Sequence, residues 1–223
     1  MAIGDLLMPC DGTMSANVKP SCIEDARALA GMTPEQEICN AATMFSPSVV
    51  GLLLWMSPPS AHFWGWRAGL VFLAIVLHLP FSIYYHAALS QRALRDAVDN
   101  VPRRLDQSFV HVASILISWA VSDSPSYATL CTLTNMYFIS RLWVKKGADK
   151  LERMLNVGIG TLLYGLGGLF RGDYYNFVCG TLYFLGGASA MFAHLGGWGH
   201  SIMHICLGGL MYHVITSAGE RNV

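Results

Sequence analysis

The chain has 223 residues, of which 53% are hydrophobic and only 13% are charged, about half the charged share usual in a soluble domain. Its formal net charge is zero, so the composition gives no indication of a nucleic-acid partner. Six scattered cysteines without a CxxC pair exclude a disulfide scaffold and a structural zinc finger. Long apolar windows instead predict an all-α integral membrane protein, a bundle of transmembrane helices.

Residues 1–33 are predicted to form a non-spanning N-terminal segment, and residues 34–223 the membrane domain. Ser21-x-x-Glu24 has the pattern of a capping box, and Gly31 is suited to end the helix that would follow. We therefore expect a short amphipathic helix lying on the membrane surface. The first fourteen residues lack a basic stretch followed by a long apolar core, so the first span is expected to act as its own insertion signal.

A second capping pattern, Thr33 to Gln36 with Pro34 at the first helical position, predicts the start of the first span. Pro47 interrupts this span, and Pro80 is expected to kink the second. Seven spans are predicted, in chain order: 38–56, 64–89, 105–121, 127–144, 154–170, 174–195 and 199–217. The fifth and sixth spans carry eight glycines, which we interpret as positions of close helix packing.

The distribution of basic residues predicts the orientation. Eleven of the fourteen lysines and arginines fall in connections on one side of the seven spans and three on the other. Because basic residues are enriched on the inner side of a membrane, the N-terminus is predicted on the cytoplasmic, matrix or stromal side. The C-terminus is then on the opposite side, since the number of spans is odd.

Ionisable residues within spans are costly and therefore indicate function. Three groups stand out: Ser82-x-x-x-His86 near the end of the second span, Asp106 at the start of the third, and His200-x-x-x-His204 at the start of the seventh. Residues four apart share one face of a helix. With the predicted topology all three groups fall at the inner end of the bundle, so they are expected to meet. Two histidines one turn apart can hold one metal ion, and a third histidine completes a zinc site with a position left open.

These motifs, in this order on seven spans, resemble the superfamily of progestin and adipoQ receptors, haemolysin III-like proteins and alkaline ceramidases. Residues 103–108 (Arg-Arg-Leu-Asp-Gln-Ser) look like a segment of the haemolysin III branch, and residues 199–204 look like the last span of the receptor and ceramidase branches. Residues 40–55 echo the first span more loosely. The resemblance extends over about residues 38–217, although only some fifteen positions carry it.

The resemblance implies a zinc ion held by His86, His200 and His204, with zinc-bound water as the nucleophile. Asp106 would help to deprotonate that water, and Ser82 would stabilise the oxyanion. The implied reaction is hydrolysis of a lipid amide such as a ceramide, so the expected partners are the lipid bilayer and a lipid substrate with an acyl chain. A carboxylate beside the water is a natural general base, which agrees with this assignment.

Two departures leave the substrate open. Gln107 stands where the receptor branch has Tyr or His, and the aromatic residues that ceramidases carry between their last two histidines are absent. A non-catalytic subunit of a larger membrane complex is therefore an alternative, as is a receptor. A haem carrier is a third class, because His200 and His213 are thirteen residues apart, but the sequence contains no partner helix with a matching pair.

Overall fold

The computed structural model describes residues 32–58, 65–91, 99–145, 150–193, 195 and 197–219. Within these ranges the ordered elements are all α-helices, which confirms the all-α class. The helices are α2 (Pro34–Thr43), α3 (Ser46–Met56), α4 (Trp66–Ser90), α5 (Val101–Val121), α6 (Pro125–Val144), α7 (Lys150–Phe170), α8 (Tyr174–Phe192) and α9 (Trp198–Ala218).

The first helical stretch begins as the sequence predicts. Thr33 caps α2 by accepting a hydrogen bond from the Gln36 backbone N–H, and the Gln36 side chain accepts one from the Thr33 N–H. Pro34 occupies the first turn, where a missing N–H costs nothing. The stretch breaks after Thr43 and resumes as α3 with Pro47 in its first turn, so the predicted interruption at Pro47 is confirmed.

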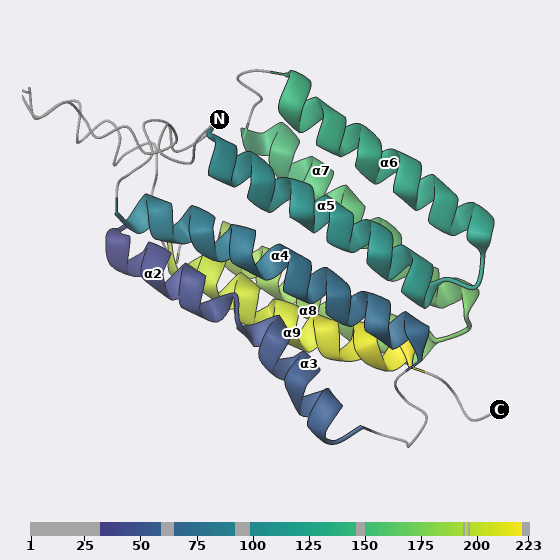
Figure 1. The fold of residues 1–223 in the computed structure, drawn as a ribbon. Coiled ribbons are helices and arrows are strands. Elements are labelled where there is room, and N and C mark those ends of the chain that lie inside the picture. Colours follow the sequence, from purple (N-terminus) through teal and green to yellow (C-terminus); the bar gives the residue numbers. More distant parts are fainter. Residues whose placement is uncertain are drawn as a thin grey trace, which may run out of the picture.

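Counting α2 and α3 as one broken helix, seven helical stretches form the bundle (Figure 1). Helix α4 packs along α5, and α8 packs along α9. Helix α9 has the central place, because it is packed against α2, α3, α4, α5 and α8. Pro80 lies inside α4, which continues as one helix from Trp66 to Ser90.

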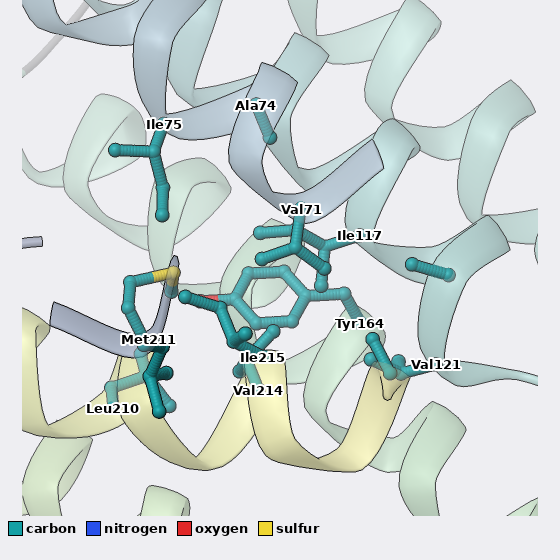
Figure 2. Packing of buried hydrophobic residues seen from close by; sticks show 13 residues of the cluster. Val71, Ala74, Ile75, Ile117, Val121, Tyr164, Leu210, Met211, Val214 and Ile215 are labelled. Carbon is teal, nitrogen blue, oxygen red and sulfur yellow. The ribbon is translucent and has the colours of Figure 1, made fainter. Parts of the chain in front are cut away.

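The main apolar core lies in one half of the bundle. Tyr164 of α7 inserts between Val71 of α4, Ile117 of α5 and Ile215 of α9 (Figure 2). Val71 precedes His86 by fifteen residues, which is about 22 Å along a helix axis. The apolar core and the histidine clusters therefore occupy opposite halves of the bundle, and packing at one end fixes the helices that carry the polar groups at the other.

Three helical stretches are long and apolar enough to cross a membrane: Pro34–Met56, Trp66–Ser90 and Trp198–Ala218. Large apolar side chains also face outward on every helix, among them Leu52, Leu133, Leu182 and Ile205, each more than half exposed. Apolar surface of this extent is unusual for a soluble monomer and suits contact with lipid. Both observations indicate a membrane protein.

The prediction of seven spans is not supported by length and mean hydropathy. Among the described residues, four further helices, α5, α6, α7 and α8, are long but not apolar enough by this criterion. The reason lies in their composition. Helix α5 begins with Arg103, Arg104 and Asp106 and contains several serines, while α7 and α8 are rich in glycine. These residues lower the mean hydropathy of helices that are long enough to span. The expected amphipathic helix of residues 1–33 lies outside the described residues, apart from Met32 and Thr33.

The glycines of α7 differ in their surroundings, which permits a matched test. A Cβ added at Gly160 would lie 2.7 Å from Oδ1 of Asn135 and 3.1 Å from Nδ1 of His111, whereas one added at Gly158 meets nothing within 4 Å. Asn135 cannot move easily, since its amide is bonded to His111 (2.8 Å) and to the carbonyl of Cys131 (2.8 Å). Gly160 therefore allows close contact of α5, α6 and α7.

We expect Gly160→Ala to destabilise the protein by about 1–3 kcal/mol, because overpacking forces these hydrogen-bonded side chains apart. Gly158→Ala, two residues away on the same helix, is expected to have no such effect. Thermal unfolding of both variants in detergent measures the difference. Equal melting temperatures for the two variants would contradict the packing described here.

Candidate metal centre

The predicted site residues come together at one end of the bundle. His86 lies near the end of α4, Asp106 near the start of α5, and His200 and His204 near the start of α9. These helix ends lie on the same side of the molecule, together with the start of α2 (Figure 1). The meeting of the three clusters, which the sequence predicted from topology alone, is therefore present in the fold.

Three imidazoles form the centre of this site. One ring nitrogen from each of His86, His200 and His204 lies within 4.8 Å of the others. The ring centroids are 5.1 Å apart for His86 and His200, 5.4 Å for His86 and His204, and 4.5 Å for His200 and His204. His86 and His204 are buried. The two histidines of α9 face one point because they are one helical turn apart.

The Nδ1 atoms of two of these rings already make hydrogen bonds. Nδ1 of His86 donates to Oε2 of Glu37 at 2.7 Å, and Nδ1 of His204 donates to the backbone carbonyl of Asn40 at 3.0 Å. With the proton on Nδ1, the Nε2 lone pair of each ring is available to a metal. A carboxylate or carbonyl behind a ligating histidine is the usual arrangement in metal sites, because it fixes the tautomer and the ring orientation.

Glu37 and Asn40 of α2 connect these contacts. Asn40 is fully buried, and its amide reaches Oε2 of Glu37 at 3.4 Å. Its Oδ1 accepts a hydrogen bond of 2.6 Å from Ser201, which lies between the two histidines of α9. Glu37 and Asn40 therefore tie α2 to both helices that carry the triad.

The sequence analysis missed Glu37, although a signal was present. It lies in the first turn of a helix that leads into an apolar stretch, and a carboxylate there could be explained as a cap or a partner of the helix dipole. The structure buries it instead, at 4% exposure. A carboxylate three residues before an asparagine, on one face of a candidate span, indicated an inward-facing polar pair.

Asp106 and Ser82 lie beside the triad. Oδ1 of Asp106 accepts a hydrogen bond of 3.1 Å from Nε2 of His78, and Ser82 is a further hydrogen-bonding neighbour of the carboxylate. His78 and Ser82 are one turn apart on α4, and His86 follows one turn later. Asp106 is also near enough to His86 and His200 for electrostatic interaction. His78 thus bonds to the carboxylate that the motifs suggest as the general base.

The remaining histidines of the described chain lie elsewhere. His111 is fully buried and bonds to Asn135 at 2.8 Å. His213, near the other end of α9, bonds through Nδ1 to Asn176 at 3.0 Å. His62 and His194 lie outside the described residues.

The donor set fits a divalent metal ion such as zinc. Three imidazoles from two helices match the three-histidine sites that leave a fourth position open. Glu37 and Asp106 add two carboxylates in a largely buried region, and a divalent cation would offset their charge where water cannot. Ligands about 2.0–2.1 Å from zinc lie about 3.4 Å apart, so small rotations of the imidazoles would bring their nitrogens to this spacing.

Comparison of the chain with protein-family models, with curated proteins and with solved structures gave no match. The resemblance to the receptor and ceramidase superfamily therefore stays a prediction made from the motifs alone. The triad itself does not depend on that resemblance, because it follows from the positions of three side chains in the fold.

We expect Glu37→Gln to weaken metal binding about 10- to 100-fold, the usual effect of removing a carboxylate behind a ligating histidine. Glu35→Gln removes the same charge from the same helical turn, on an exposed side chain, and is expected to leave the affinity unchanged. Competition with a chromogenic chelator measures both affinities. Equal metal affinities of the two variants would show that Glu37 does not help His86 to bind the metal.

Proposed function

We propose that the chain is a zinc-dependent membrane hydrolase that cleaves a lipid amide. The observation that carries the proposal is the convergence of His86, His200 and His204, with Asp106 and Ser82 beside them, at one end of an apolar bundle. A zinc ion with three imidazole ligands retains a position for water and lowers the pKa of that water to about 7. The resemblance noted from the motifs points to the same chemistry.

The chain's own residues supply the rest of the reaction. Asp106 accepts a proton from the attacking water and later gives it to the amide nitrogen as the C–N bond breaks. The products are a fatty-acid carboxylate and a protonated amine, so the one water consumed for each amide supplies the carboxylate oxygen and both protons taken up by the nitrogen. His78 holds the carboxylate of Asp106 in place. The Ser82 hydroxyl, which in the structure hydrogen-bonds to Asp106, would turn from that carboxylate to donate to the oxygen on which negative charge develops.

The bundle also offers room for an acyl chain. A cavity of about 230 Å³ lies between α5, α7, α8 and α9, and its lining is mainly apolar, with Tyr164, Phe184 and Leu210 among the lining residues. Leu210 follows His204 by six residues, about 9 Å along the helix. The cavity is lined by none of the triad residues and lies toward the other end of α9, where it could receive only the distal part of an acyl chain whose carbonyl is near the triad.

The wider membrane topology belongs to the same proposal. We infer that all seven helical stretches span the membrane, with the triad at the inner end and the N-terminus on the cytoplasmic, matrix or stromal side. The basic residues of the described chain support this orientation, because Arg103, Arg104, Arg141, Lys145 and Arg153 all lie at the triad end, where the sequence places the inner surface.

The reaction is tested by comparing Asp106→Asn with His204→Ala. We expect Asp106→Asn to retain the metal but to lose about 10²- to 10⁴-fold in hydrolysis of a ceramide or an N-acylethanolamine, since only the general base is removed. His204→Ala is expected to lose both metal and activity. Elemental analysis and release of free fatty acid measure the two properties. Full activity of Asp106→Asn, or a metal-free wild type, would overturn the proposal.

The topology is tested with small tags at the two termini of the full chain. In sealed vesicles of one orientation, an odd number of spans places the tags on opposite sides, so protease removes only one of them. We expect the N-terminal tag on the inner side. Removal or protection of both tags together would require an even number of spans and would contradict the seven-span proposal.

A further inference from the structure

The cavity between α5, α7, α8 and α9 extends toward the end of the bundle opposite to the triad. Its lining on α9 runs from Leu210 through His213 to Ser217, which is two turns further along the helix. Ser217 follows His204 by thirteen residues, about 20 Å along the helix axis. A group bound at this end of the cavity therefore lies far from the metal centre and does not depend on it.

The side chain of Ser217 carries a buried polar atom without a partner. Ser217 is 5% exposed, and its Oγ makes no hydrogen bond with any of the residues that the structure describes. Its backbone carbonyl is satisfied, because it accepts a hydrogen bond from Nη1 of Arg171. A buried hydroxyl without a partner is costly, so this one requires an explanation.

Space is present beside this hydroxyl. A Cβ added at Gly168 of α7 would lie 3.9 Å from Oγ of Ser217 and 3.7 Å from Cβ of Phe177. These are ordinary van der Waals distances, so a volume of at least one methyl group is free there. Gly168, Phe177 and Ser217 all line the cavity, and a ligand in the cavity can therefore bring a polar group to Oγ.

The other polar groups around this end of the cavity are bonded to one another. Nδ1 of His213 donates to Oδ1 of Asn176 at 3.0 Å. The Asn176 amide in turn donates to the carboxylate of Asp173 at 3.0 Å, which fixes the orientation of the amide. The Ser217 hydroxyl therefore remains as the group to which a ligand can bond.

The charges at this end of the bundle balance. Asp123 pairs with Arg67 and lies 3.6 Å from Arg171, and Asp173 is the second carboxylate. Among the described residues at this end, two guanidinium groups thus face two carboxylates. An uncharged polar group suits such surroundings better than an anion or a cation, since neither charged group would find an excess of the opposite sign.

The rest of the cavity suits a hydrocarbon chain. Phe184 and Leu210 line it, and so do Leu162 and Leu166 of α7, which are 47% and 38% exposed on the apolar outer surface of the bundle. A chain can therefore enter from lipid between α7 and α8. The distance from Ser217 to Leu210 is about 10 Å along the helix, and an extended chain advances about 1.2 Å per bond, so about eight bonds fit.

We propose that this cavity binds an uncharged single-chain lipid whose hydroxyl group pairs with Ser217 and whose chain lies against Leu210 and Phe184. The site is separate from the proposed hydrolase reaction and goes beyond it. An acyl chain arriving from the triad would place its methyl end beside Ser217 and leave the hydroxyl unpaired, whereas a ligand with its own hydroxyl at this end satisfies it.

The test uses octanol that carries a diazirine on its third carbon as a photolabel, with the full-length protein in phosphatidylcholine nanodiscs. Mass spectrometry of the peptides locates the label. Octanol, chlorooctane, octanoate and octylamine, which differ only in the end group, compete with it. Thermal unfolding without any of these compounds reports the stability of each variant.

Four variants separate the contributions. Ser217→Ala removes the hydroxyl, and Gly168→Ala fills the space beside it without a clash. Gly158→Ala is the matched control, because it makes the same change on the same helix, outside the cavity lining, where a Cβ meets nothing within 4 Å. His204→Ala removes a residue of the triad and tests whether the site is independent of the metal centre.

We expect the label on α7 and α9 at the cavity, and octanol to compete at about fivefold lower concentration than the other three compounds, the effect of one hydrogen bond. Ser217→Ala should abolish this preference and also raise the melting temperature, since an unpaired buried hydroxyl is removed. Gly168→Ala should weaken competition by octanol, while Gly158→Ala and His204→Ala should leave it unchanged.

Label found only outside the cavity, or a preference for octanol that survives in Ser217→Ala, would overturn the inference. Stronger competition by octanoate or octylamine would overturn the assignment of an uncharged ligand. Loss of labelling in His204→Ala would show that the cavity belongs to the metal centre, which contradicts a separate site. A protein that hydrolyses no lipid amide would count against the proposed function alone, because the labelling requires no turnover.

Discussion

The buried contact between Glu37 and His86 determines how the polar end of this bundle is organised. A carboxylate in an apolar environment is costly unless it is paired, so Glu37 holds the Nδ1–H of His86 at 2.7 Å and fixes which nitrogen of the ring faces the triad. Asn40 extends the same constraint to α9 through Ser201 and through its backbone carbonyl, which accepts a hydrogen bond from Nδ1 of His204. The short helix α2 thus orients His86 of α4 and His204 of α9.

Packing at the other end of the bundle makes this arrangement possible. Tyr164, Val71, Ile117 and Ile215 join α4, α5, α7 and α9 in a dense apolar cluster. The buried polar residues Glu37, Asn40, Ser82 and Ser201 lie around the triad. Gly199 contributes at the triad end, because an added Cβ there would collide with the backbone carbonyl of Ala190. The first turn of α9, which carries His200, can therefore approach the last turns of α8 closely.

Much of this arrangement could be predicted from local patterns. The capping box at Thr33, the helix ends and the histidine spacings follow from periodicity and capping, and the predicted topology placed the three clusters at one end. The spacing of Glu37 and Asn40 indicated a shared polar face on the first helix, but the sequence alone did not show that this face is the buried one. Glu37 is buried and Glu35 is exposed, although both lie in the same turn, because only the position of α2 against α4 and α9 separates them. The number of spans is also harder to predict from the sequence where glycine and serine lower the mean hydropathy of packed helices.

X-ray absorption at the zinc edge of the purified protein tests the central claim most directly, because it reports the ligands without requiring activity. The account predicts bound zinc with three imidazole nitrogens at about 2.0–2.1 Å, a light oxygen ligand and no sulfur. A shell containing sulfur near 2.3 Å would place the ion at a cysteine site. That result, or zinc-free protein in which Glu37 is simply paired with a protonated His86, would contradict the account.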